Sequence, residues 1–547
     1  MDGWWQTGVV YQIYPRSYAD SNGDGIGDLA GIAAHLDHLA GRPDSLGVDA
    51  IWLSPFYPSP DYDFGYDVAD YVGVDPRFGS LADFERLVEA CHGRGLKVII
   101  DLVLNHSSSE HPWFEASRAS RSGPFADWYI WRDSPGRSRT GGRRRPNNWR
   151  SFFGGPGWEW DRAREQFYLH TFLPQQPDLN WRNPEVREAL LGVVRTWLDR
   201  GVDGFRLDVF NTYFKDAQLR SNPWRLGGRG AWSWQRHIHD RDQPELRPLL
   251  TELRAIVDER PGRMTVGELF DDTLVDAAPL IAPRHLVFDW SLITVPWSAA
   301  AFRRAILDRD AAFGPGRWPA NVLSNHDQPR HASRLAPPGA DVTAVAEGDA
   351  RAKVAATLLL TMRGTAFLYY GEEIALRNLS IPNAQAVDPP ARRASFLFPW
   401  WNRDQARGPM SWSAGPGGGF SSGRPWLPLA PDAARRNVAV ESADRSSVLN
   451  VYRQLLGLRR ASPALQAGDQ ELADTGAADV LAYVRRAGDS AAFVALNFAS
   501  HPASVAVPAA PAGGDWQVRL STTGRGLGEN FAGTATLAPL EALVATT

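Results

Sequence analysis

The chain has 547 residues and a formal net charge of -4 at pH 7, which is too weak to favour nucleic acid or an anionic membrane as a partner. Its single cysteine, Cys91, excludes an intramolecular disulfide framework. The N-terminus lacks a basic segment followed by an apolar one, and no later run reaches transmembrane length. We therefore expect a cytoplasmic protein with room for roughly three or four domain-sized units.

The first two-thirds of the chain alternates short strands rich in β-branched residues with amphipathic helices. We expect strands at 9–14, 50–53, 98–104, 204–207, 264–266, 286–288, 321–323 and 366–370, and helices that include 81–93 and 186–200. Eight strands with helices between them predict a parallel (β/α)8 barrel, that is, a TIM barrel of the α/β class. In this fold the chemistry takes place at the C-terminal ends of the strands.

Two segments extend beyond the barrel. From His106 to Asp208 there are 102 positions, against roughly 30 residues in a minimal β-α-β unit, so we expect a loop-rich subdomain after the third strand. Its basic run at 143–145 is predicted to be solvated surface rather than a nucleic-acid site. A helix at 448–460 is expected to close the barrel, and alternating segments after it predict an antiparallel β-sandwich. The predicted domains are 1–106 and 177–465 for the barrel, 107–176 for the insertion, and 466–547 for the sandwich.

Four short strings place polar side chains at predicted strand ends. They are DLVLNH ending at His106, GFRLD ending at Asp208, VGE ending at Glu268 and SNHD ending at Asp327. Any one of them is weak evidence, because apolar runs that end in Asp are common in parallel sheets. Together they indicate a retaining glycosidase acting on α-linked glucose, in which one carboxylate attacks, another protonates the leaving oxygen and a third stabilises positive charge.

The neighbours of two of these carboxylates suggest different protonation states. Arg206 lies two residues before Asp208, so both side chains point to the same side of one strand, and the guanidinium is expected to keep Asp208 ionised. Glu268 has no basic residue within three positions and follows apolar Val266. An apolar environment favours the protonated carboxyl that an acid catalyst needs.

The chain resembles glycoside hydrolase family 13, the α-amylase family, and within it the oligo-1,6-glucosidase and α-glucosidase group. The resemblance runs from the opening YQIYPRSYADSNGDGIGDL to the C-terminal sandwich, and QPDLNW at 176–181 is similar to the marker of that group. It implies that Asp208 is the nucleophile, Glu268 the general acid/base and Asp327 the transition-state stabiliser.

The same resemblance implies a set of sugar-binding residues. Asp63 and Tyr66, in DFGYD, match the pair that lines the non-reducing sugar site of the family. Arg407, in RGPMSW, matches the arginine of the R-T-P-M-x-W pattern, although Gly408 replaces the usual threonine. His106 and His326 share strand ends with the carboxylates and are candidates for binding glucose hydroxyls.

Two phenylalanines are possible aromatic walls of the sugar site. Phe153 and Phe172 fit this role, but packing in the protein interior explains both almost as well. Val209 directly follows the nucleophile. In the resembled group, valine here accompanies activity on α-1,6 bonds, whereas threonine or alanine accompanies a preference for α-1,4 bonds. Packing against the barrel wall is the alternative explanation for Val209.

The segment DSNGDGIGD has the spacing of a calcium-binding loop. Side chains of Asp20, Asn22 and Asp24, the carbonyl of Ile26 and the side chain of Asp28 supply oxygen ligands, with Gly25 at the turn. It departs from an EF-hand because position 12 is glycine and no helix is expected before it. The resembled family carries a structural calcium ion in this loop, and a metal-free series of Asx turns is the alternative.

Three functions are compatible with these features. The first is an exo-acting α-glucosidase that removes one glucose from the non-reducing end of short α-glucosides, with α-1,6 or α-1,4 linkages. The second is a glucosyltransferase or isomerase that acts on sucrose or maltose through the same covalent intermediate. The third, a catalytically silent partner of a membrane transporter, is disfavoured by the intact triad and by the lack of a membrane segment.

Overall fold

The computed structural model describes residues 3–138, 141–227, 232–269, 285–314, 316–338, 342–393, 402–511 and 514–547. Eight parallel strands close into a barrel in the order β1-β11-β10-β9-β8-β7-β3-β2. They are β1 Val9–Ile13, β2 Ala50–Leu53, β3 Lys97–Leu102, β7 Gly204–Leu207, β8 Met264–Gly267, β9 Leu286–Asp289, β10 Ala320–Val322 and β11 Thr365–Tyr369. The predicted (β/α)8 barrel is confirmed, with each strand within one or two residues of its expected place.

Both faces of the barrel strands are buried, as expected for a parallel sheet covered by helices. Side chains that point inward form one apolar cluster, which includes Trp52, Ile99, Val266, Phe288 and Phe367. The register sets Asp101 of β3 beside Arg206 of β7, and Arg206 beside Val266 of β8. Neighbouring strands therefore bring polar residues to the same level at the carboxyl end of the barrel.

Long amphipathic helices cover the outside of the barrel. They are α5 Leu81–His92, α7 Pro184–Asp199, α8 Leu246–Asp258, α10 Ala299–Phe313, α12 Val342–Thr361 and α15 Val448–Ala461. Local sequence explains where they begin: Ser80 and Asp83 form a capping box on α5, and Asn183 caps α7 with Pro184 in its first turn. On α7 the buried residues Val186, Leu190 and Val194 recur every four positions, which is one face of a helix.

Short helices occupy the connections, where the labels η mark 3-10 helices. They are α1 Trp4–Thr7, α2 Pro15–Tyr18, α3 Leu29–Ala34, α4 Leu36–Leu39, η1 Phe210–Thr212, η2 Ser291–Ile293, α11 His331–Arg334, η3 Glu372–Ile374, η4 Asn383–Gln385, α13 Pro389–Arg393, η5 Arg403–Ala406, η6 Pro416–Gly419, α14 Val438–Ala443 and α16 Pro463–Ala467. In the part of the chain that the structure describes, no helix combines the length and apolar character needed to cross a bilayer.

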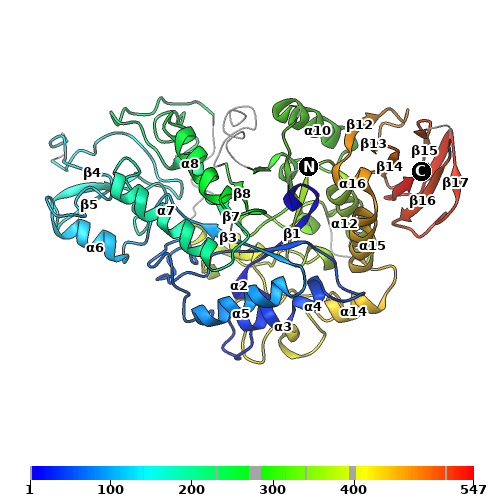
Figure 1. Ribbon diagram of the computed structural model, residues 1–547, viewed down its shortest axis with the longest axis horizontal. Helices are drawn as coiled ribbons and strands as arrows, with labels where there is room; N and C mark the ends of the chain where they lie inside the picture. The colour runs from blue at the N-terminus through cyan, green and yellow to red at the C-terminus, as the bar shows by residue number, and fades with distance from the viewer. Residues whose placement is uncertain are drawn as a thin grey trace.

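The segment between β3 and β7 contains α6 Pro112–Ala119 and a small antiparallel sheet. Its strands are β4 Trp131–Arg132, β5 Trp158–Asp161 and β6 Gln166–Leu169, in the order β4-β6-β5. It has a core of its own that includes Trp149, Trp158 and Phe167. This segment lies at one end of the long axis of the molecule and the C-terminal sheet at the other (Figure 1). The insertion predicted after the third strand thus contains regular structure as well as loops.

The C-terminal region forms two antiparallel sheets. The larger has the order β12-β13-β14-β19-β16-β17 and the smaller pairs β15 with β18. The strands are β12 Asp469–Ala473, β13 Val480–Ala487, β14 Ser490–Asn497, β15 Ala503–Ala506, β16 Trp516–Ser521, β17 Asn530–Phe531, β18 Thr534–Leu537 and β19 Ala542–Thr546. One apolar cluster joins Val505 and Leu537 of the smaller sheet to Phe493 and Val518 of the larger. The predicted C-terminal antiparallel β-sandwich is confirmed.

Candidate active site

Acidic side chains and one arginine meet at the carboxyl ends of three neighbouring barrel strands. Asp208 directly follows β7 and Glu268 directly follows β8, while Asp101 lies in β3 opposite Arg206. Arg206 Nη1 donates a hydrogen bond of 2.5 Å to Asp101 Oδ1 and another to Asp208 Oδ1. Its Nη2 donates to Glu268 Oε2. One buried guanidinium therefore bridges three carboxylates.

The two carboxyl groups that face each other across Arg206 have raised pKa values. Burial raises the pKa of Asp208, Arg206 lowers it in part, and Glu268 and Asp101 raise it further. Burial also raises the pKa of Glu268, against the opposing effect of Arg206. Because the two acids repel each other across one cation, they titrate as a pair. Arg206 lowers the pKa of Asp208, which is the expected direction, but burial and the neighbouring carboxylates outweigh this effect.

The surroundings of Glu268 differ from the expectation in one respect. The sequence around it predicts apolar neighbours, yet Arg206 is in direct contact with its carboxyl group. Arg206 precedes Glu268 by 62 positions, and adjacent strands bring the two together. The pKa of Glu268 is still raised, as an acid catalyst requires, because burial is the largest effect.

Asp327 follows the end of β10 and is held by a different set of cations. Arg407 Nη2 donates a hydrogen bond of 2.7 Å to Asp327 Oδ1, and Arg403 Nη1 donates one of 3.3 Å to the same oxygen. Burial alone would raise the pKa of Asp327, but His326 and the two guanidinium groups lower it below its usual range. Asp327 is therefore a fixed negative charge, unlike the coupled pair on Arg206.

Histidine and tyrosine side chains line the pocket beside Asp327. Tyr66 Oη lies 2.6 Å from His326 Nε2, and the side-chain amide of Gln12 lies 2.8 Å from His326 Nδ1. Since the amide N–H of Gln12 donates to Nδ1, His326 carries its proton on Nε2. Burial lowers the pKa of His326 to about 3, so the ring is neutral at pH 7.

The opposite side of this pocket contains His106 and Asp63. His106 Nε2 lies 3.0 Å from the carbonyl of Tyr66, and burial lowers the pKa of His106 to about 4. Gln176, the first residue of QPDLNW, donates from Nε2 to Asp63 Oδ2 at 3.1 Å. Neutral histidines and amides present hydrogen-bonding groups without a net charge, which suits the hydroxyl groups of a sugar.

Arg403 and Gln176 belong to this site although neither was predicted from the sequence. Arg403 Nη2 donates hydrogen bonds of 2.6 Å to Asp63 Oδ1 and 2.7 Å to Asp388 Oδ1. It therefore connects Asp63 to Asp327, which lie far apart in the sequence. Arg403 precedes Arg407 by four positions, and this helical spacing is the one sequence signal that places Arg403 beside a predicted site residue. Nothing in the sequence near Arg403 indicates Asp63 as its partner.

Val209 and several aromatic rings form an apolar cluster beside the nucleophile candidate. Phe172, Val209 and Trp232 are buried together, and Phe152 and Phe153 pack against them. Val209 has φ 36° and ψ 38°, a left-handed conformation that strains a β-branched residue. The structure thus groups Phe153, Phe172 and Val209 of the predicted residues, and adds Trp232, which sequence reasoning missed.

A comparison with known families decides what this barrel is. Residues 12–468 match the family model described as the alpha amylase catalytic domain. The chain belongs to the α-amylase family, glycoside hydrolase family 13. A probable alpha-glucosidase from Rhizobium meliloti (strain 1021) is 44% identical over 520 residues, which cover 92% of this chain and 91% of that protein.

Further relatives place this family 13 member in the α-glucosidase group. An oligo-1,6-glucosidase from Parageobacillus thermoglucosidasius is 36% identical over 528 residues, which cover 90% of each protein. The alpha-glucosyl transfer enzyme XgtA is 42% identical with a TM-score of 0.89, and trehalulose synthase MutB from Pseudomonas mesoacidophila MX-45 is 34% identical with a TM-score of 0.88. Both structures match over 100% of each chain. The protein is a glycoside hydrolase of the α-glucosidase and oligo-1,6-glucosidase type.

In this family 13 member the predicted calcium loop is a series of Asx turns. Asp20 Oδ1, Asn22 Oδ1 and Asp24 Oδ1 each accept a hydrogen bond from the backbone N–H two residues further on, at 2.8–3.0 Å. Asp28 Oδ1 accepts from Gly31 and caps α3. The expectation that no helix precedes the loop is wrong, because the four-residue α2 ends two positions before Asp20.

Close packing against a distant segment defines the shape of this loop. Gly25 has φ +92°, and a Cβ there would lie 2.0 Å from the carbonyl oxygen of Arg424. Ser421 Oγ donates to Asp20 Oδ2 at 2.5 Å. Among the described residues no group of three His, Cys, Asp or Glu side chains is placed to hold a metal, but the expected ligands also include an amide and a backbone carbonyl. The oxygen donors suit a hard cation such as calcium.

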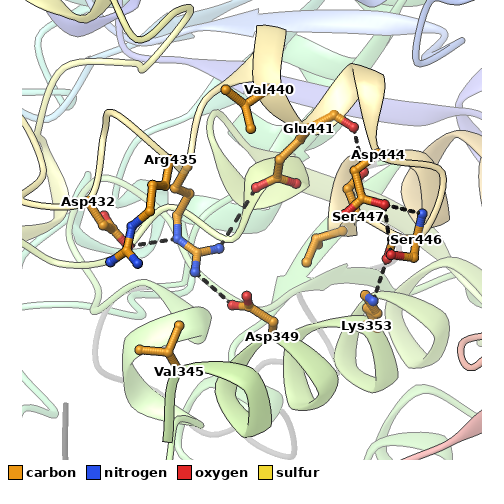
Figure 2. Close-up of a pocket in the computed structure, with 12 residues that line it drawn as sticks. Val345, Asp349, Lys353, Asp432, Arg435, Val440, Glu441, Asp444, Ser446 and Ser447 are labelled. Atoms are coloured by element: carbon orange, nitrogen blue, oxygen red, sulfur yellow. Dashed lines mark hydrogen bonds and ion pairs between the residues drawn. The ribbon is translucent and has the colours of Figure 1, made fainter. Parts of the chain in front are cut away.

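A second cavity of about 290 Å³ lies on the outside of the barrel, between α12 and the α14–α15 connection (Figure 2). Arg436 is bound there to Asp349 at 2.8 Å and to Asp432 at 2.9 Å, and it lies 3.9 Å from Glu441. Lys353 Nζ donates to the carbonyl of Ser446 at 2.5 Å. The arginine that lines this cavity is thus matched by carboxylates of the protein itself.

Proposed function

We propose that the protein is a retaining, exo-acting α-glucosidase that releases glucose from the non-reducing end of short α-glucosides. The observation that carries the proposal is the single guanidinium of Arg206 bridging Asp208 and Glu268. A shared guanidinium favours a short separation of the two carboxyl groups, and retaining enzymes have them roughly 5–5.5 Å apart. The names of the relatives from Rhizobium and Parageobacillus support the same substrate class.

In the first step Asp208 attacks the anomeric carbon and Glu268 donates its proton to the glycosidic oxygen. The C–O bond of the substrate breaks, and a glucosyl ester forms on Asp208. The raised pKa of Glu268 supports its role as the proton donor, and contact with Arg206 lowers the pKa of the attacking Asp208 against the effect of burial. In the second step Glu268 takes a proton from water, and the water oxygen attacks the anomeric carbon. The bond from that carbon to Asp208 breaks, which releases glucose and leaves Asp208 as a carboxylate.

Asp327 has a separate role in both steps. Its lowered pKa keeps it negative, so it stabilises the positive charge that develops on the sugar ring without exchanging a proton. Arg407 and Arg403 hold its carboxylate in place. Because fixed charges do not need to reorganise during the reaction, this arrangement stabilises the transition state more than the ground state.

The exo mode follows from the residues around the sugar pocket. Arg403 joins Asp63 to Asp327, while Gln176 joins Asp63 to His106. In this proposal the non-reducing sugar binds among these residues, away from the leaving group. Because the contacts connect these residues to one another, we expect this end of the site to hold one glucose unit and no longer chain.

The test is hydrolysis of p-nitrophenyl α-glucoside, followed by NMR of the first-formed sugar. We expect release of p-nitrophenol and the α anomer of glucose. The β anomer would contradict retention, and activity only inside long chains would contradict the exo mode. An Asp208→Ala variant serves as the blank for contaminating activity.

A second candidate function is transfer of the glucosyl group, or isomerisation, with sucrose or maltose as donor. Similarity to XgtA, an alpha-glucosyl transfer enzyme, and to the trehalulose synthase MutB supports it. Both functions share the glucosyl-enzyme intermediate and differ in what attacks it. Product analysis with sucrose and with maltose distinguishes them: free monosaccharides favour hydrolysis, and new disaccharides favour transfer.

For the metal, we propose that the loop from Asp20 to Asp28 holds a structural calcium ion. Asp20, Asn22, Asp24, the Ile26 carbonyl and Asp28 supply the oxygen ligands, which are the donors that calcium prefers. A ligand that binds only the folded protein raises Tm by mass action, so excess EDTA should lower Tm and added calcium should restore it. An unchanged melting curve, with no metal in the purified protein, would contradict the site.

A further inference from the structure

Trp232, in the connection between η1 and α8, is buried in one apolar cluster with Phe172 and with Val209, the residue that follows the nucleophile candidate. The ring of Phe152 lies edge-on to it, with centroids 5.6 Å apart at 85°. Trp232 is 7% exposed, which is close to the 5% of Asp208 and the 6% of Tyr66. The indole therefore has the same limited access to solvent as residues of the sugar pocket.

A histidine and an aspartate hold this indole in one orientation. The ring of His237 stacks on Trp232 with centroids 3.6 Å apart and an interplanar angle of 13°. His237 Nε2 lies 2.9 Å from the carbonyl of Trp232, and His237 Nδ1 lies 2.7 Å from Asp240 Oδ2. Since both ring nitrogens face an oxygen acceptor, the imidazole cannot rotate without losing a hydrogen bond.

The segment that carries Trp232 is also fastened to the inserted subdomain. Asn148 and Asn222 exchange hydrogen bonds between side chain and backbone, at 2.8 Å and 2.9 Å. Gln235 Nε2 donates to the carbonyl of Asn148 at 2.8 Å, and Trp149 Nε1 donates to the carbonyl of Arg220 at 2.9 Å. An aromatic wall built on this segment is therefore pre-organised.

The position of this wall identifies the sugar it would contact. The polar residues that bind the first glucose, Asp63 and His106, come from other strand ends, whereas Trp232 packs on Val209, next to the attacking carboxylate. Apolar C–H faces of a sugar ring stack on aromatic rings. We propose that Trp232, held by His237 and Asp240, forms the wall of the acceptor site, which binds the leaving sugar and then a carbohydrate acceptor. This proposal rests on the α-glucosidase mechanism above.

The step that this site would favour is transfer of the glucosyl group to a sugar hydroxyl. The hydroxyl oxygen of the acceptor forms a bond to the anomeric carbon of the glucosyl ester, and the bond from that carbon to Asp208 breaks. Glu268 receives the proton of the hydroxyl, and Asp208 leaves as a carboxylate. Water gives hydrolysis by the same route, so an occupied acceptor site decides the ratio of the two products.

The experiment uses α-glucosyl fluoride as donor and maltose as acceptor. Fluoride leaves without needing a sugar in the acceptor site, and the ratio of transfer product to free glucose reports how the intermediate partitions. That ratio does not depend on how much of the enzyme is active. We expect Trp232→Leu to lower it by about tenfold, the size of a lost apolar contact with a substrate. Trp232→Phe keeps an aromatic face and should retain most of the ratio of transfer product to free glucose.

Controls separate contact with the acceptor from a general effect. Trp224 lies in the same segment but is 61% exposed and outside the cluster, so Trp224→Leu should leave the ratio unchanged. His237→Ala should lower the ratio by raising the KM for maltose, and His237→Phe, which keeps a stacking ring, should restore part of it.

The outcomes distinguish the two proposals. An unchanged ratio in Trp232→Leu, in protein that melts like the wild type, would overturn the acceptor site and leave the α-glucosidase intact. If Trp232→Leu unfolds, an unchanged KM for maltose and an unchanged ratio in His237→Ala would overturn it. No fluoride release by the wild type would overturn the proposed function and the acceptor site with it.

Discussion

Arg206 and Arg436 are both buried and each hold several carboxylates, yet of these two only Arg206 lies in the proposed active site. Arg206 binds Asp101, Asp208 and Glu268 at the strand ends. Arg436 binds Asp349 and Asp432 on the outer surface of the barrel, with Glu441 close by. A cation that gathers acids is therefore not in itself a sign of catalysis.

The two clusters differ in the elements that carry their acidic residues and in the pKa values of those residues. Around Arg206 they come from three adjacent strands, and burial raises the pKa of both Asp208 and Glu268, so the proton has two possible positions. Around Arg436 the acids come from helices and their connections, and a raised pKa is resolved for Glu441, to about 7. Strand ends of a barrel converge on one space, whereas helices on its outside diverge.

The largest expected effect is on activity at the Arg206 cluster. Asp208→Ala and Glu268→Gln should each lower kcat by about 10⁴-fold or more, because each removes a group that forms or breaks bonds. Asp349→Asn, the matched change at the Arg436 cluster, should keep kcat close to that of the wild type. Steady-state hydrolysis of p-nitrophenyl α-glucoside measures all three. Comparable losses in all three variants would abolish the distinction between the two clusters.

Substitution of the two arginines should separate an effect on stability from an effect on activity. Arg436→Met leaves the half-buried Asp349 and Asp432 and the buried Glu441 without their cation. It should therefore lower the free energy of unfolding by less than the roughly 3–5 kcal/mol of a fully buried pair, while retaining activity. Arg206→Met should abolish activity, because it removes the cation that holds the carboxyl groups of Asp208 and Glu268. Urea unfolding and steady-state hydrolysis of p-nitrophenyl α-glucoside measure these effects. An active Arg206→Met enzyme would contradict the bridging role.

Most of the strand-end cluster around Arg206 could be predicted from the sequence, whereas most of the Arg436 cluster could not. The eight strands show as short apolar runs, and the four motifs mark the ends where His106, Asp208, Glu268 and Asp327 stand. The contact between Arg206 and Glu268 could not be predicted, because it depends on the register between two strands. For Arg436 the i,i+4 spacing to Asp432 is a local signal, but Asp349 and Glu441 come from separate elements and could not be predicted.

The intermediate effect concerns the pH dependence of stability. Burial raises the pKa of Glu441 from 4.5 to about 7, so the folded chain holds this proton more tightly than the unfolded chain does. The wild type should therefore lose on the order of 2–3 kcal/mol of stability as the pH rises from about 4.5 to 7. The Glu441→Gln variant has no carboxyl group that titrates at this position, so it should not lose this stability. We expect the Tm of the wild type to fall relative to that of the variant between pH 5 and pH 8, and parallel curves would contradict this.

The smallest effect tests the linkage preference at Val209. Val209→Thr replaces a methyl group by a hydroxyl at nearly constant volume, beside the site of the leaving sugar. We expect isomaltose to be hydrolysed at least as well as maltose by the wild type. The variant should shift the ratio of kcat/KM toward maltose by a factor that corresponds to about 1–3 kcal/mol. Val440→Thr, in the cavity beside Arg436, is the matched control; an unchanged ratio at Val209 would remove it as the determinant.

The aromatic residues of the site illustrate which contacts could be predicted from the sequence and which could not. Phe153 and Phe172 lie within the predicted insertion at 107–176, and the sequence makes both candidates for the sugar site. Trp232 was missed because its partners, Val209 and His237, come together through a loop that no periodicity describes. Arg403 was missed for a similar reason, since its contact with Asp63 spans 340 positions.

The way the barrel closes has a consequence for its synthesis. β1 pairs with β2 on one side and with β11 on the other, and Val9 lies opposite Ala366. At roughly 5–20 residues per second, the ribosome releases Ala366 about twenty to seventy seconds after Val9. Throughout that interval the first strand has an unpaired edge of the kind that invites aggregation. The four motifs leave the ribosome before β11 and Arg407 leaves after it, so the contact between Arg407 and Asp327 is among the last parts of the site that can form.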